Sequence, residues 1–393
     1  MALATQTDLV CDKRSIPWSS LVFIITELGR RNLLGLVVPR NPDGKAFQSK
    51  GIRFFRLVDA LHHQSPGTWN LAHLLVHSSF LEASDDRDRV FALLGLAYDA
   101  TGPLFEPNYA NTPSELFVST AAELLRRGGS SNLILHCAGI GFDRKLFDLP
   151  SWVPDWTERD GSYELGVIAF LALYHADSNT TNTYHQQEEQ ILTLSGYIFD
   201  VITNLVPPRS RLEPRPGIAN DMAEATAILR WKDSIQDLYL PSTVHPCGLP
   251  YYPDIVWRTL VASTTHTGVP APVNFQQYFQ DFILYSENTA AREKIDRLPQ
   301  DPQISESVYI FLMALARHQY HRTVFISRQG YLGLGPPKIE LGDKICVFLG
   351  FATPFIVRPR EEGGYFLVGE CHVYGLMDGE VLVGGTLEEI ALH

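Results

Sequence analysis

The sequence contains few cysteines and few basic residues, and both shortages exclude classes of protein. Its 393 residues include five cysteines, which are widely spaced and form no Cys-x-x-Cys pair. This pattern argues against a zinc knuckle and against a dense disulfide framework, so we expect reduced thiols and a cytoplasmic location. Lysine and arginine total 32 against 44 acidic residues, a net charge of −12. Because nucleic-acid binding needs clustered basic residues, no nucleic-acid partner is expected.

The sequence also lacks a long apolar run and a targeting signal. The longest apolar run, 165–174, is shorter than the roughly 18 residues of a membrane-spanning helix, so no membrane span is expected. The first residues show no basic region followed by an apolar one, so no secretory signal is expected. Apolar residues make up 45% and charged residues 19% of the chain, which is typical of a globular protein.

Fingerprints of cofactor and metal binding are absent as well. The glycine-rich segment 330–336 is not followed by Gly-Lys-Ser/Thr, and Pro336-Pro337 prevents a helix from starting there, so we interpret it as a turn between strands. His73 and His77 have the spacing of a helical metal site, but the glutamate of His-Glu-x-x-His and a third ligand are missing. We therefore predict no cofactor and no metal site.

The first part of the chain is predicted to be helical. Apolar residues recur at intervals of three and four, which places them on one face of a helix. On this basis we expect helices over 18–34, 55–61, 69–80, 88–96 and 112–127. The helix over 88–96 is apolar all round, so we expect it to lie in the core. The helix over 112–127 begins with Thr112 as its cap and Pro113 at its first position.

From Leu149 onward the composition favours a Trp/Pro-rich corner, short strands and one helical insertion. The elements expected here are a strand over 174–178, a polar loop over 179–190, a strand over 191–195, a helix over 218–240 and a loop over 241–253. Short β-branched or aromatic runs then alternate with Gly or Pro turns, at 323–327, 344–349, 355–358, 365–369 and 371–374. A closed or half-open barrel would hide the edges of such strands.

The predicted fold class is therefore α+β. A mostly helical N-terminal part is expected to pack on a β-rich C-terminal part with a small barrel-like or half-open sheet. The expected parts are a helical domain over 1–148, the Trp/Pro corner with short strands over 149–215, a helical insertion over 216–320 and a β-rich subdomain over 321–393.

Alternating charges at 85–89 form a first candidate binding site. Asp85, Asp86 and Asp88 would favour the positive end of the helix dipole, while Arg87 and Arg89 can form paired hydrogen bonds with carboxylates. One interpretation is a helix cap with an ion network that joins the N-terminal helices to a later segment. The other is a clamp for an anion or nucleotide, built from the two arginines.

The Trp/Pro corner is a second candidate. Asp155 lies beside Trp152 and Trp156, and burial among the indole rings would raise the pKa of its carboxyl group. Such a group could serve as a general acid, although a carboxylate that accepts hydrogen bonds from backbone N–H groups is the commoner arrangement at a proline-rich corner.

Several segments resemble a known family, in the same order along the chain. They are Ser84-Asp-Asp-Arg-Asp-Arg-Val-Phe-Ala-Leu-Leu-Gly-Leu-Ala97, Leu149-Pro-Ser-Trp-Val-Pro-Asp-Trp156, 191–200, 256–260 and 335–343. Together they resemble the region that follows the signature domain of fungal heterokaryon-incompatibility (HET) proteins. The Tyr-x-x-Leu-Ser-Tyr-x-Trp-Gly and Trp-Ile-Asp-x-x-Cys-Ile-Asn-Gln motifs of that domain are missing from the sequence. The expectation is a scaffold and C-terminal part without the effector domain.

The resemblance implies an accessory, regulatory or interaction protein that takes part in non-self recognition and programmed cell death, with a protein partner. An enzyme remains the alternative: a cofactor-free hydrolase, isomerase or cyclase of a fungal biosynthetic pathway, with a small-molecule ligand. Its pocket would lie between the helical and β parts, lined by Trp152, Trp156, Tyr174 and His175. A deep apolar pocket with convergent polar groups would favour the enzyme and a filled interior the interaction protein, which we favour here.

Overall fold

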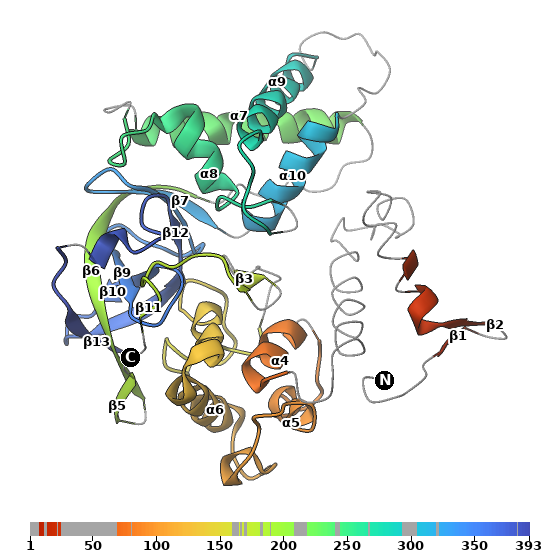
Figure 1. Cartoon of the computed structure of the whole chain (residues 1–393), viewed down its shortest axis with the longest axis vertical. Coiled ribbons are helices and arrows are strands. Elements are labelled where there is room, and N and C mark those ends of the chain that lie inside the picture. Colours follow the sequence, from red (N-terminus) through yellow and green to blue (C-terminus); the bar gives the residue numbers. More distant parts are fainter. Residues whose placement is uncertain are drawn as a thin grey trace. The chain divides into compact units, whose positions relative to one another are not determined.

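A computed structural model describes most of the chain (Figure 1), and the described residues fall into two compact units. They are 8–11, 14–21, 23–24, 69–79, 81–158, 165, 167–168, 171–180, 184–188, 190–207, 218–239, 244–265, 268–292, 305–319, 322–382 and 384–393. One unit comprises Met1–Pro113 with Arg159–Gly161, and the other comprises Ser114–Glu158 with Ser162–His393. The predicted α+β class is confirmed by the helices and strands described below.

The first unit contains a short hairpin and two short helices. The strands β1 (Asp8–Cys11) and β2 (Arg14–Pro17) pair antiparallel. Helix α4 (Leu71–Ser78) begins where the side chain of Asn70 accepts a hydrogen bond from the backbone N–H of His73, so the helix predicted over 69–80 is confirmed. The helix predicted over 18–34 is described only at 18–21 and 23–24, where it is helical, and 55–61 lies outside the described residues.

Helix α5 (Asp88–Leu94) forms where it was predicted, but it is less buried than expected. Only Val90 and Phe91 are buried, while Leu93, Leu94 and Leu96 are half-buried. The prediction that this helix lies in the core all round is therefore wrong. An apolar helix can be buried on every face, but the segments that pack against it decide which faces are covered.

In the second unit, helix α6 (Pro113–Arg127) follows the predicted chemistry. It starts with a proline at its first position and ends at Gly128, which has a φ of 67° that favours glycine. Its buried face is formed by Leu116, Phe117, Thr120, Ala121, Leu124 and Leu125. The 3₁₀ segment η2 (Gly129–Cys137) follows it and leads to the Trp/Pro corner.

Five strands close into a barrel in this unit. They are β6 (Ile191–Val206), β9 (Lys344–Phe348), β10 (Phe355–Pro359), β11 (Tyr365–Glu370) and β13 (Glu388–Leu392). Their order is β6-β13-β11-β10-β9, and β9 pairs with β6 again, which completes the ring. Only β11 and β13 pair in parallel. The barrel removes the open edges that these strands would otherwise expose, as the sequence predicted.

Further strands extend the sheet from the second half of β6. Register shifts along β6, opposite β9 and opposite β7, bend this long strand. Its later residues pair with β7 (Thr323–Ser327), which continues to β8 (Leu332–Gly335) and β12 (His372–Val373). The predicted C-terminal strands are thus confirmed. Smaller pairs are formed by β5 (Tyr184–Glu188) with β6, and by β3 (Val167–Ile168) with β4 (Leu171–Ala172).

Two predictions between the corner and β6 are wrong. Residues 174–178 form an extended segment and a turn in place of a strand, because Ser178 and Asn179 adopt positive φ angles and Asp177 accepts a hydrogen bond from the backbone N–H of Asn179. The predicted loop over 179–190 contains strand β5, which uses β6 as its template. Short polar strands of this kind are decided by the neighbour with which they pair.

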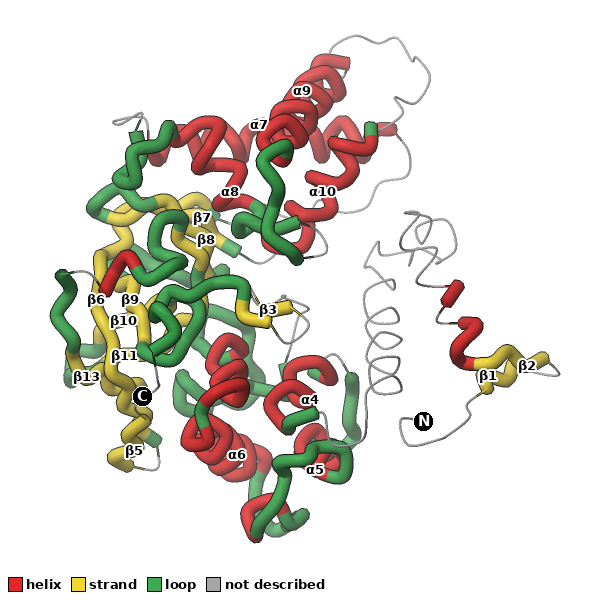
Figure 2. Tube along the Cα trace, in the orientation of Figure 1, coloured by secondary structure: helices red, strands yellow, loops and turns green. Residues whose placement is uncertain are grey.

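A helical insertion separates β6 from β7 (Figure 2). It comprises α7 (Ile218–Tyr239), the short helical segment η3 (Tyr251–Ile255), α8 (Val256–Leu260), α9 (Phe275–Arg292) and α10 (Glu306–Gln319). The helix predicted over 218–240 is confirmed. Of the loop predicted over 241–253, residues 244–250 are loop as expected, and η3 begins at Tyr251. Aromatic side chains such as Trp257, Phe279 and Phe311 form the insertion's core, which continues onto Val324 and Leu334 of the sheet. The barrel has its own core, which includes Ile202, Phe325 and Ile356.

Candidate functional site

The charged segment at 85–89 ties neighbouring loops of the first unit together. The guanidinium of Arg87 donates to both carboxylate oxygens of Asp85, at 2.9 and 2.7 Å, and to the carbonyls of Tyr109 and Asn111. These bonds lower the pKa of Asp85 to about 2. Arg89 donates to Asp86 and to a carbonyl eight residues earlier. The bonds of both arginines therefore run within one stretch of the chain, 81–111, where the sequence had suggested either a longer-range network or an anion clamp.

Asp155 holds the corner of the second unit in place. One of its carboxylate oxygens accepts hydrogen bonds from the backbone N–H groups of Lys145 and Leu146, at 2.7 and 2.9 Å. The other accepts from the backbone N–H and the hydroxyl of Thr157, at 2.9 and 2.5 Å. The carboxylate thus fixes the loop that runs from Asp143 toward the corner, as the commoner of the two predicted arrangements would.

The aromatic candidates lie in filled parts of the interior. Trp152 is fully buried and donates from Nε1 to the carbonyl of Gln190, and Trp156 packs edge-on against Phe117. Tyr174 is buried, and its hydroxyl donates to the carbonyl of Ala262. These three candidate side chains are packed against the protein's own groups.

Two further groups near Tyr174 differ in exposure. The ring of Tyr174 meets His372 edge-on at 5.6 Å, and burial raises the pKa of the Tyr174 hydroxyl. His175, its neighbour in sequence, is half exposed, with its Nδ1 4.0 Å from a carboxylate oxygen of Asp378. The candidates of the corner and of this segment are therefore not gathered around one cavity.

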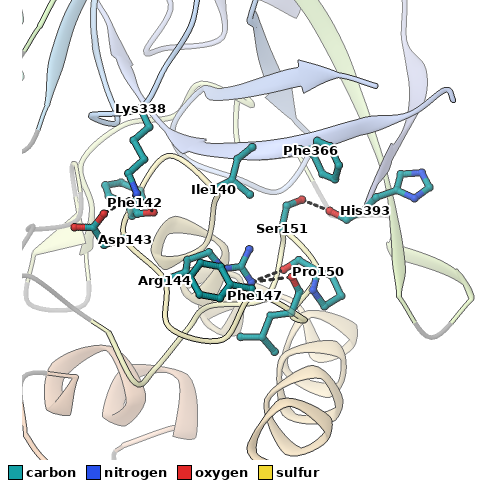
Figure 3. Close-up of a pocket in the computed structure, with 11 residues that line it drawn as sticks. Ile140, Phe142, Asp143, Arg144, Phe147, Pro150, Ser151, Lys338, Phe366 and His393 are labelled. Atoms are coloured by element: carbon teal, nitrogen blue, oxygen red, sulfur yellow. Dashed lines mark hydrogen bonds and ion pairs between the residues drawn. The ribbon is translucent and has the colours of Figure 1, made fainter. Parts of the chain in front are cut away.

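A pocket of about 480 Å³ lies elsewhere in the second unit, beside the corner (Figure 3). Its apolar walls are Ile140, Phe142, Phe147, Leu149, Pro150 and Phe366. Its polar lining is Asp143, Arg144, Ser151, Lys338 and His393. Trp152, Asp155, Trp156, Tyr174 and His175 do not line it. The sequence analysis missed this site, because most of its residues carry no motif and Lys338 is distant in sequence from Arg144.

Close backbone approach positions the loop that forms most of this pocket. The backbone N–H groups of Ile140 and Gly141 donate to the carbonyls of Leu367 and Val368 in β11, both at 2.9 Å. Gly139 has a φ of 129°, and a Cβ atom there would lie 2.2 Å from the carbonyl oxygen of Val368. Only glycine allows the chain to approach β11 this closely. The pocket is therefore built against the barrel wall.

The polar groups of the pocket differ in how well they are partnered. Nη2 of Arg144 donates to the carbonyls of Leu149 and Pro150, at 2.9 and 3.1 Å, while its Nε atom is buried without a hydrogen-bond partner (Figure 3). Burial lowers the pKa of Arg144. Lys338 pairs with Asp143 at 2.6 Å. The pocket thus combines one guanidinium that lacks a carboxylate partner with one neutralised lysine.

A buried charge network lies deeper in the same unit. The Oε1 atom of Glu370 accepts from Nη2 of Arg322 at 2.9 Å and from the backbone N–H of Leu165 at 2.7 Å, and its Oε2 atom lies 2.9 Å from Nδ1 of His136. Glu370 lies 48 residues from Arg322, 205 from Leu165 and 234 from His136, and no motif marked these groups. Because both oxygens of Glu370 are engaged, the network connects η2, the start of β7 and the end of β11.

The described residues offer neither a metal site nor a membrane-spanning helix. They contain no group of three His, Cys, Asp or Glu side chains arranged to hold a metal ion. In the same part of the chain, none of the helices is both long and apolar enough to span a bilayer.

Comparison with known proteins gives this architecture a context. Residues 271–390 match the Het-6 beta-barrel domain family, and β6, which completes the barrel, lies outside the matched segment. The chain is 26% identical over 350 residues to heterokaryon incompatibility protein 6, OR allele, of Neurospora crassa. This alignment covers 79% of the chain and 51% of the relative, so the chain spans about half the length of the curated relative it matches. The comparison with solved structures found no match. The barrel match and the long alignment identify the chain as a protein related to the heterokaryon-incompatibility proteins.

Proposed function

We propose that this chain is an interaction protein of the heterokaryon-incompatibility type. It contributes to non-self recognition, and through it to programmed cell death, by binding a protein partner in the cytoplasm. The observation that carries the proposal is an exposed aromatic side chain on a tightly held loop: Phe147 is 88% exposed at the edge of the pocket. The relationship to heterokaryon incompatibility protein 6 supplies the biological setting.

The loop around Phe147 is held by several independent contacts. Asp155 binds the backbone N–H groups of Lys145 and Leu146, and Lys145 also pairs with Glu158. Arg144, which precedes Phe147 in sequence, donates to the carbonyls of Leu149 and Pro150, which follow it. A fixed loop loses little conformational entropy on binding, and a preorganised aromatic side chain is typical of the residues that dominate protein interfaces.

The interior of the second unit gives less support to the enzyme alternative. Trp152 and Tyr174 are buried and hydrogen-bonded to backbone carbonyls, and both oxygens of Glu370 are engaged. A general base needs a reactive lone pair within reach of a substrate. In the pocket beside Phe147, the guanidinium and the ion-paired lysine suit recognition, and the ring of His393 points away from the other lining residues (Figure 3).

The test is a cell-fusion assay in a filamentous fungus. The chain is expressed in one strain, which fuses with a strain of a different incompatibility type, and dead fusion cells are counted by uptake of a vital dye. We expect death with the wild-type chain and its loss with Phe147→Asp. The matched control is Val273→Asp, since Val273 is 86% exposed and does not line the pocket. Equal protein amounts are checked by immunoblot. Death unchanged by Phe147→Asp, or absent with the wild type, would overturn the proposal.

A further inference from the structure

We propose that the pocket beside Phe147 binds an acidic residue flanked by an apolar one in the partner protein, with the carboxylate on Arg144 and the apolar side chain against Phe147. This inference rests on the proposed interaction function and names the chemistry of the segment that is recognised. It follows from the state of the cation, from the surrounding charges and from the walls of the pocket.

Arg144 has hydrogen-bonding capacity that the protein's own groups do not use. Of its guanidinium nitrogens, Nη2 binds the carbonyls of Leu149 and Pro150 and Nε is enclosed without a partner, whereas Nη1, which is not enclosed, forms no hydrogen bond with the described residues. Within the described part of the chain, no carboxylate pairs with this side chain. Buried cations are normally paired with an anion, because the loss of hydration is otherwise uncompensated. Because both hydrogens of Nη2 are used, a carboxylate would accept a charge-assisted hydrogen bond from Nη1.

The acidic groups near Arg144 leave this place open. Asp155 and Asp148 are close enough to raise the pKa of Arg144, but Asp155 is occupied by backbone N–H groups and by Thr157. Asp143 pairs with Lys338 across the pocket. Neither Asp155 nor Asp148 forms an ion pair with Arg144, so the place beside its guanidinium can take one carboxylate of a ligand. A phosphate group, with its greater charge, would need several donors, and the walls supply mostly carbon.

The walls define the rest of the ligand. Phe142, Phe147 and Phe366 face a volume of about 480 Å³, and Phe147 extends from the rim with most of its ring exposed. Aromatic rings bury large areas of an apolar side chain at a low entropy cost. A short segment with one carboxylate and one aromatic or large aliphatic side chain thus fits both the charge and the surface of the pocket.

A pair of peptides tests the inference on the purified full chain. N-acetyl-Glu-Phe-amide carries the carboxylate, and N-acetyl-Gln-Phe-amide has the same shape without the charge. Binding is followed by NMR titration at one ionic strength. We expect the Glu peptide to bind at least tenfold more tightly than the Gln peptide, a difference of about 1.4 kcal/mol. Equal affinities, or binding of neither peptide, would overturn the inference.

Variants and a small acid locate the site and its natural source. Phe147→Ser weakens binding of the Glu peptide, while Val273→Ser, at an equally exposed position, leaves it unchanged. Arg144→Gln removes the preference for the Glu peptide; because Arg144 also holds the loop, the wild-type peptide comparison decides the question if this variant does not fold. Free 3-phenylpropionate is titrated in parallel. If it binds and the Glu peptide does not, the pocket recognises a small acid, and a partner segment is excluded as its ligand.

The two proposals fail in different ways. If the chain binds both peptides equally but Phe147→Asp abolishes cell death, the interaction function stands and the proposed recognition of a carboxylate is wrong. If the Glu peptide binds as expected but Phe147→Asp leaves cell death unchanged, the pocket has a ligand and the interaction function is wrong.

Discussion

Arg322 and Glu370 form an ion pair in the interior of the second unit, with Nη2 and Oε1 2.9 Å apart and the two side chains only 2% and 1% exposed. A second bond runs from Nη1 of Arg322 to the backbone carbonyl of Glu370. The pair joins the residue just before β7 to the last residue of β11. It therefore couples the sheet extension to the barrel.

Removing one member of this pair should strongly destabilise the fold. We expect Arg322→Met to lower the free energy of unfolding by about 3–5 kcal/mol, because the Glu370 carboxylate would remain buried without its cation. Urea denaturation followed by circular dichroism measures the loss. Arg126→Ala is the control, since the side chain of Arg126 is 62% exposed and its pair with Glu123 should contribute no more than about 1 kcal/mol. Similar losses in both variants would contradict the structural role given to the buried pair.

Tyr174→Phe tests the filled interior. The hydroxyl of Tyr174 donates to the carbonyl of Ala262, and both groups are buried. In the variant, the carbonyl of Ala262 loses the hydrogen bond that it accepts from Tyr174. We expect the free energy of unfolding to fall by about 1–3 kcal/mol. The same denaturation experiment measures it. An unchanged stability would mean that water replaces the hydroxyl, and hence that the interior is more open than described.

Gly139→Ala tests the close contact between the pocket loop and β11. The substitution places a Cβ atom against the carbonyl of Val368 and forces alanine into a φ of 129°. We expect a loss of about 1–3 kcal/mol or more, measured by denaturation. Gly95→Ala is the matched control, because Gly95 has a φ of −69° and an added Cβ meets nothing within 4 Å. That variant should be neutral or slightly stabilising.

Stability should decrease as the pH falls below about 6.5. Burial, with Arg322 as a further cause, lowers the pKa of His372 to about 3, and burial also lowers that of His318 well below its usual value. The unfolded chain therefore binds more protons than the folded one below pH 6.5, through a window that extends to about pH 3 for His372. Each histidine then costs about 1.4 kcal/mol per pH unit as the pH falls through this window.

The groups that surround these two histidines reinforce the sign of this effect. Arg317 and Arg322 both disfavour a positive charge on His318. His318 contacts the hydroxyl of Thr264 and His372 contacts the ring of Tyr174, and neither of these partners is a carboxylate. Urea denaturation at pH 7, 6 and 5 measures the slope. His372→Gln should flatten it, and a slope that is the same in this variant and the wild type would show that other groups control acid stability.

The sequence predicted the C-terminal strands well, because each is a short apolar run between glycine or proline turns. The strand at 323–327 and the hairpin around 355–369 are examples. Closure of the barrel by β6 could not be read in this way, since β6 is separated from β9 by the whole helical insertion. The turn at Ser178 and Asn179 was missed because Tyr174-His-Ala has the composition of a strand, and the turn depends on the Asp177 side chain.

For the candidate sites, the sequence indicated the role of single residues more reliably than it indicated which residues lie together in space. The commoner of the two roles considered for Asp155, a carboxylate that accepts hydrogen bonds from backbone N–H groups, matches its bonds in the structure. Arg144 and Phe147 were overlooked, since a single arginine and a single phenylalanine carry no spacing signal. Their significance comes from a loop fixed against β11 and from Lys338, which is brought alongside by the barrel.

The position of β6 before the insertion has a consequence for how the barrel is made. During synthesis β6 leaves the ribosome first, and every barrel partner that it needs emerges only after the helices of the insertion. Until then β6 has only the short β5 to pair with, and most of its length stays unpaired, while the insertion can already form its local helical contacts. Late closure of this kind is slow and exposes strand edges to aggregation. We therefore expect nascent chains that stall within the insertion to depend on chaperones.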